Sequence, residues 1–132
     1  MNTEILRRLK GIGIAALLLA APALAHHSSA MFDASKEVQI KGVVKVFKFE
    51  NPHVNIVVTV PGDKPGTGTD WYIEAASVRG LAMAGWRRST LKPGDVITVV
   101  GRPLRDGQPG ASLVRAILAD GTTLAANAGR NY

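Results

Sequence analysis

Apolar and polar residues alternate with period two in several short stretches of this chain, and this pattern constrains the fold more than any other feature. The clearest stretch is residues 54–60, where Val54, Ile56 and Val58 fall on one face while Asn55 and Thr59 fall on the other. Such alternation is typical of a β-strand with one buried and one exposed face. The pattern therefore predicts a small β-domain rather than a helical one.

The same pattern, with the turn signals between stretches, predicts five strands and a terminal hairpin. A glycine, Gly42, interrupts the first strand, and the apolar parity changes after it, which predicts a bulge or bend there. Ser77 is a suitable N-cap for a short helix that Gly85 would end. The expected strands are residues 37–49, 54–60, 71–75, 96–101 and 113–118, the helix is 78–84, and a hairpin leads into 122–124. We therefore expect an all-β domain with one short helix, a five-stranded Greek-key barrel like the OB-fold. Its predicted core includes Val54, Ile56, Val58, Trp71 and Ile73.

Residues 1–25 resemble a secretory signal peptide. Basic residues precede an apolar run at 12–21, and Ala23-Leu24-Ala25 follows as a small-x-small cleavage signal. The run is too short to span a bilayer. We therefore expect cleavage after Ala25 and a soluble periplasmic or secreted protein with no membrane span. The mature chain would comprise an arm at 26–36, the barrel at 37–124 and a flexible tail at 125–132.

Composition narrows the chemistry. The chain has no cysteine, so no disulfide holds the fold and no thiolate is present. Its net charge is +6, and removing residues 1–25 takes away Arg7, Arg8, Lys10 and Glu4, which lowers that charge by two. This mildly basic balance favours anionic surfaces, but with so few aromatic residues it does not indicate nucleic acid. No nucleophile triad, acid pair or phosphate loop is present, so we expect a protein that is not an enzyme.

The three histidines lie in two short segments and form the main candidate site. Cleavage after Ala25 would place a free amine on His26, next to His27, and His53 is the other imidazole. Amine and imidazole nitrogens favour copper(II) among divalent ions. If the arm folded back along the barrel, all three histidines could bind one ion. Alternatively, His26 and His27 belong to an unordered start, and His53 is a strand-entry residue that is hydrogen-bonded to a neighbour.

Three carboxylates are candidates for orienting the histidines. Glu50 precedes the Asn51-Pro52-His53 turn, and Glu74 lies on the polar face of the third strand. Asp33 lies in the arm, where a backbone or basic partner is expected. A carboxylate beside an imidazole commonly fixes the tautomer of a metal ligand. The alternative is that these are ordinary exposed acids.

Trp86, with Arg87 and Arg88 directly after it, forms a second candidate site. An aromatic ring beside guanidinium groups can stack on a sugar or bind an anion. The competing interpretation is a half-buried ring whose basic neighbours are solvated.

Several short motifs give the chain a resemblance to a known family. These motifs are His26-His27-Ser28, Phe32-Asp33, Asn51-Pro52-His53, Trp71 with Glu74, Gly85-Trp86 and Pro93-Gly94-Asp95. Together they resemble a family of small exported bacterial proteins of unknown function. The resemblance implies the same export and fold but no established activity.

Two hypotheses follow from these observations. The first is an exported metal-binding protein, with copper as the expected ion and His26, His27 and His53 as ligands. The second is an OB-type binding module without metal, whose ligand would be an oligosaccharide, a peptide or another exported protein. The second rests on fold analogy and on the Trp86 cluster.

Overall fold

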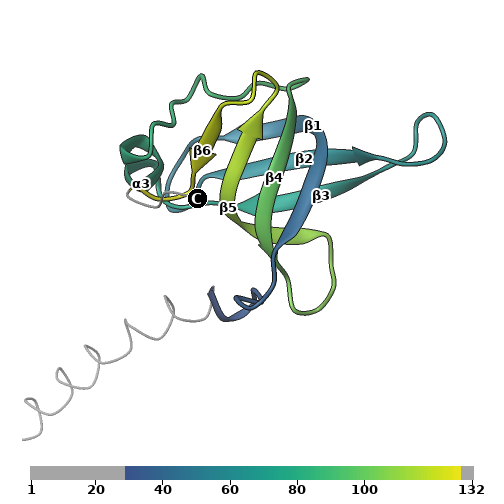
Figure 1. Cartoon of the computed structure of the whole chain (residues 1–132), viewed down its shortest axis with the longest axis horizontal. Helices are drawn as coiled ribbons and strands as arrows, with labels where there is room; N and C mark the ends of the chain where they lie inside the picture. Colours follow the sequence, from purple (N-terminus) through teal and green to yellow (C-terminus); the bar gives the residue numbers. More distant parts are fainter. Residues whose placement is uncertain (1–28, 129–132) are drawn as a thin grey trace, which may run out of the picture. The chain divides into compact units, whose positions relative to one another are not determined.

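The computed structural model describes residues 29–128. Between Phe32 and Ala128 the chain folds into one compact unit that contains six strands and the helix α3 (Figure 1). In chain order they are β1 (Val38–Lys48), β2 (Asn55–Pro61), β3 (Gly68–Glu74), α3 (Val78–Met83), β4 (Val96–Pro103), β5 (Gly110–Leu118) and β6 (Thr123–Ala125). The predicted order of elements is confirmed.

The strands close into a barrel. Their order in the sheet is β3-β2-β1-β4-β5-β6, with antiparallel neighbours, and β3 also pairs with β5 in parallel. This parallel pairing joins Tyr72 to Gly110 and Glu74 to Ser112, which closes a ring of five strands. With α3 between β3 and β4, this is the topology of the OB-fold, as the sequence predicted.

The irregularity in β1 lies two residues after the predicted position. The pairing with β2 shifts register between Val44 and Val46, so the bulge is there and not at Gly42. Gly42 instead marks a close approach of β1 to β2, since a Cβ at this position would lie 2.8 Å from Cγ1 of Val58. The glycine is needed for space, and the parity change that follows it has its cause in the bulge.

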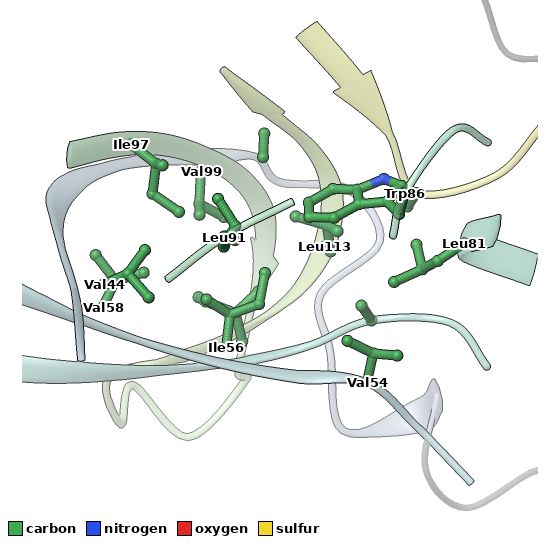
Figure 2. Close-up of a cluster of buried hydrophobic side chains, with 14 of the residues drawn as sticks. Val44, Val54, Ile56, Val58, Leu81, Trp86, Leu91, Ile97, Val99 and Leu113 are labelled. Atoms are coloured by element: carbon green, nitrogen blue, oxygen red, sulfur yellow. The ribbon is translucent and has the colours of Figure 1, made fainter. Parts of the chain in front are cut away.

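The core lies inside the barrel, where valine and isoleucine side chains from facing strands pack together (Figure 2). Val54, Ile56, Val58 and Ile73 are fully or almost fully buried, as their parity predicted. Trp71 has the predicted inward direction, but its ring is only partly buried at the edge of the core. The predicted register is therefore confirmed, with Trp71 packed against the core rather than fully inside it.

Helix α3 begins and ends as its capping residues predicted. The Ser77 side chain accepts a hydrogen bond from the Gly80 amide at 3.3 Å, and Gly85 has a φ of +93° just after the helix. Leu81 is completely buried and anchors the helix to the barrel. Within residues 29–128, no helix is long and apolar enough to cross a membrane.

The last strand extends slightly further than expected. β6 contains Ala125, and the buried Ala126 donates its amide to the Val114 carbonyl at 2.9 Å. These two residues therefore belong to the barrel and not to the predicted tail. Residues 129–132 of that tail, and the predicted signal peptide at 1–25, lie outside the described residues.

Candidate functional site around His53 and Glu74

The segment that carries His53 is tied to the junction between β3 and α3. The Asn51 side chain accepts a hydrogen bond from the Val78 amide at 3.1 Å, at the start of the helix. One residue beyond His53, Val54 donates to Ala76 at 3.1 Å and accepts from Ala75 at 2.8 Å. These bonds hold the backbone of His53 close to the end of β3.

Glu74 is the residue at that end of β3, and its side chain contacts the imidazole. Nδ1 of His53 lies 3.1 Å from Oε1 of Glu74, and the two side chains are 41% and 33% exposed. Asn55, opposite Glu74 in the β2–β3 pairing, donates its side-chain amide to the His53 carbonyl at 2.8 Å. The period-two pattern had placed Glu74 on the polar face of β3, and it is on this face that Glu74 meets the imidazole.

The contact determines which nitrogen of the imidazole can bind a ligand. An ionised carboxylate only accepts hydrogen bonds, so Glu74 favours the tautomer of His53 that carries its proton on Nδ1. In the neutral ring, Nε2 then keeps its lone pair. Among the described residues Nε2 has no hydrogen-bond partner, and the ring is partly exposed. The pair thus presents one oriented nitrogen donor at the surface.

The arm is anchored at Phe32. This ring is 8% exposed, and Phe32 forms an antiparallel bridge with Leu104, which follows β4. The Asp33 amide donates to the Pro103 carbonyl at 2.8 Å, and the Leu104 amide donates to Gly110 at 3.0 Å. The anchor lies beside the strand β5 that pairs with β3.

Asp33 stabilises a turn in the arm. Its Oδ1 accepts hydrogen bonds from the Ser35 hydroxyl at 2.6 Å and the Ser35 amide at 3.1 Å, and Lys36 lies 3.3 Å from Oδ2. The bonds from Ser35, with a smaller contribution from Lys36, lower the pKa of Asp33 to about 2. The expected backbone and basic partners are present. The contacts of Asp33 are with these residues and Arg105, not with His53.

Glu50 makes no contact with His53. It is exposed, and it forms no hydrogen bond or ion pair within the described part of the chain. Of the three carboxylates that the sequence suggested, Glu74 is therefore the one that the fold brings to the imidazole.

The second predicted site does not present its ring. Trp86 is completely buried, its Nε1 donates to the Ala125 carbonyl at 2.8 Å, and its ring lies 6.3 Å from that of Phe47 (Figure 2). The Trp86 amide also donates to Leu81 at 3.0 Å, so the turn at Gly85 directs the indole into the barrel. Both predictions for Trp86, a ligand-binding ring and a half-buried ring, are wrong.

The two arginines after Trp86 differ from each other. Nη1 of Arg87 donates to the carbonyls of Ala82 at 3.2 Å and Trp86 at 2.8 Å, at the C-terminal end of α3. Arg88 is exposed. Without an accessible indole, these side chains do not form the ring-and-guanidinium site that the sequence suggested.

The other two predicted ligands, His26 and His27, lie outside the described residues. Within residues 29–128, no three histidine, aspartate or glutamate side chains form a group able to hold a metal ion. One residue of this face was not singled out from the sequence: Tyr72 shares the outer face of β3 with Glu74 and is 64% exposed. Tyr72 lies two residues before Glu74, so the period-two pattern places both on the same outer face of β3 and could have identified Tyr72 as a candidate.

Comparison with known proteins places the chain in a family. No curated protein and no solved structure matches it significantly. The model of DUF6152, a family of unknown function, matches residues 15–112, which include His53, Glu74 and Trp86. The sequence resemblance to a family without an assigned activity is thereby confirmed. The chain belongs to the DUF6152 family.

Proposed function

We propose that this protein is exported and binds one metal ion, with copper(II) as the preferred ion, through His26, His27 and His53. The observation that carries the proposal is the contact between Nδ1 of His53 and Glu74 at 3.1 Å. A carboxylate in this position would fix the orientation of the ring, as the outer-shell partners of metal-bound histidines do. Nε2 is then the donor atom of His53.

One imidazole does not hold a copper ion tightly, so the other donors must come from elsewhere in the chain. Cleavage after Ala25 would supply the amine and imidazole of His26 and the imidazole of His27. These nitrogen donors match the preference of copper(II). The periplasmic or extracellular location belongs to the same proposal, since the free amine exists only after cleavage.

The anchor at Phe32 makes this arrangement sterically feasible. Backbone pairing connects the anchor to β3 in three steps: Phe32 pairs with Leu104, Leu104 with Gly110, and Gly110 with Tyr72. The distance from Phe32 to Glu74 is then three strand spacings of about 5 Å each plus two residues along β3, or roughly 15–20 Å in total. The six residues 26–31 can span roughly 20 Å when extended. Because Ser29 and Ala30 are helical in the structure, the proposed site requires this part of the arm to extend.

The test is a copper(II) titration of the processed protein that begins at His26, followed by native mass spectrometry and calorimetry. We expect one ion per chain, and we expect His53→Ala to weaken binding at least tenfold. Glu74→Gln should weaken binding about 10- to 100-fold, because the positioning contact changes. Glu50→Gln is the matched control, since that nearby carboxylate does not contact the imidazole.

Two results would contradict the proposal. One is micromolar or weaker binding that His53→Ala leaves unchanged. The other is equal effects of Glu74→Gln and Glu50→Gln, which would remove the positioning role. Protein that keeps an extra methionine before His26 provides a further control, because its amine is displaced and its copper affinity should be lower.

A binding module without metal is the second candidate, and the exposed Tyr72 favours it. The ring is 64% exposed on the outer face of β3, and Glu74 and Asn55 flank it. The β2–β3 face is where OB-folds bind oligosaccharides and other chains. An oligosaccharide, a peptide or an exported protein partner would contact Tyr72, and the His26, His27 and His53 triple alanine variant would still bind it. Tyr72→Ala would abolish that binding.

A further inference from the structure

The segment between Glu74 and Asp95 has an unusual charge distribution. It contains four basic residues, Arg79, Arg87, Arg88 and Lys92, and no acidic residue. All four are exposed. Elsewhere in the barrel several basic groups lie beside acids, such as Lys45, which forms an ion pair with Asp70 at 2.6 Å. This segment therefore carries a local positive charge that its own sequence does not neutralise.

Helix α3 adds an exposed apolar side chain to this positive surface. Leu81 is buried, while Arg79 and Met83 are one turn apart on the opposite face of the helix. Met83 is 68% exposed, more than the other large hydrophobic residues described as exposed. Figure 1 shows α3 outside the ring of strands, so this face points away from the barrel.

Two more arginines follow Met83 closely in the sequence. Arg87 is held at the C-terminal end of α3 by the carbonyls of Ala82 and Trp86, and Arg88 follows it on the surface. We call Arg79, Met83, Arg87 and Arg88 together the α3 corner. Because Leu81 and Trp86 are fully buried beneath it, the corner is a fixed part of the fold.

We propose that the α3 corner binds the surface of an anionic lipid bilayer. The guanidinium groups would contact lipid phosphates, and Met83 would enter the headgroup region, as basic and apolar side chains do in interfacial helices. The two clefts described in the structure lie elsewhere, around Val96 and Leu118, and no residue of the α3 corner lines either of them. A bilayer needs no complementary cavity, whereas a soluble anionic ligand is commonly held in one.

The experiment is co-sedimentation of the processed protein with vesicles of phosphatidylcholine, with and without phosphatidylglycerol. We expect binding only to the anionic vesicles, and weaker binding as salt rises. The double variant Arg79→Ala and Arg88→Ala should lower the partition coefficient about 25-fold, or about fivefold for each charge. Arg87 is left in place because its contacts support the end of the helix.

The matched control removes the same charge elsewhere. Lys41 and Lys64 are exposed, on β1 and in the β2–β3 loop, and their double alanine variant should change binding twofold or less. Met83→Ala should weaken binding severalfold, and this loss should persist at high salt because it is not electrostatic. Circular dichroism and thermal melting would confirm that each variant is folded.

Three outcomes would overturn the proposal. Equal losses in the two double variants would show that net charge alone attracts the protein to vesicles. Unchanged binding by Met83→Ala would remove the insertion step. Binding to soluble polyphosphate that competes fully with vesicles, and that depends on the same arginines but not on Met83, would identify a soluble polyanion as the ligand. None of these readouts involves copper, so they are independent of the proposed metal site.

Discussion

Two short segments of this chain carry candidate ligand-binding residues, and the fold treats them in opposite ways. Around His53, the imidazole is half exposed and a carboxylate 3.1 Å away orients it. Around Trp86, the indole is completely buried and its polar Nε1 is bonded inside the protein. Residue types that can bind ligands therefore indicate a site only when the backbone directs them to the surface. For His53 and Glu74 strand parity supplied that information, and for Trp86 no pattern did.

The largest effect that separates the two segments is on stability. Trp86→Ala should lower the free energy of unfolding by on the order of 3 to 5 kcal/mol, because it leaves a cavity in the core. It also leaves the Ala125 carbonyl without its donor. Urea denaturation followed by circular dichroism would measure the loss. An unfolding free energy within 1 kcal/mol of wild type would contradict the buried position of the ring.

A smaller loss is expected at the other tryptophan. Trp71 is partly buried at the edge of the core, so Trp71→Ala should cost about half as much as Trp86→Ala, roughly 2 kcal/mol. Because the side chain removed is the same, the difference reports the deeper burial of Trp86 together with its hydrogen bond to Ala125. Equal losses in the same urea experiment would mean that Trp71 is as deeply packed as the period-two pattern of β3 suggested.

The sequence predicted the barrel well because its strands follow a simple rule. Period two placed Ile56 and Ile73 inside and Glu74 outside, and the caps at Ser77 and Gly85 defined the helix. The bulge was assigned to Gly42 because a glycine is visible in sequence, whereas the register shift at Val44 and Val46 depends on the pairing with β2.

The candidate site was predictable only in part. Parity and the Asn51-Pro52 turn brought His53 and Glu74 to one side of the sheet. The position of Trp86 depends on hydrogen bonds to Leu81 and Ala125, which are distant or irregular in sequence and leave no periodic signal. Local patterns determine which face a strand residue occupies, but the direction of a loop side chain depends on tertiary contacts.

The contribution of Asp33 in the arm to stability should depend on pH. Hydrogen bonds from Ser35 lower the pKa of Asp33 from 3.8 to about 2, so the ionised carboxylate stabilises the folded state. This contribution is fully present above about pH 5 and is lost as the pH falls from about 4 to 2. Asp33→Asn should therefore lower the urea midpoint at pH 6, and the difference from wild type should shrink below about pH 4 and vanish below about pH 2. A difference that stays constant over this range would show that ionisation of Asp33 is not involved.

The smallest effect should be at His53, and it completes the contrast with Trp86. The imidazole is 41% exposed, and its contact with Glu74 is a surface pair, which contributes little to folding. His53→Ala should therefore change the unfolding free energy by no more than about 0.5 kcal/mol in metal-free protein. If copper binds as proposed, excess copper should raise the stability of the wild type, because the three histidines come together only in the folded state. The variant should gain less from copper. A loss of 2 kcal/mol or more without metal would instead assign His53 a structural role, that of holding the Asn51-Pro52 turn against β3.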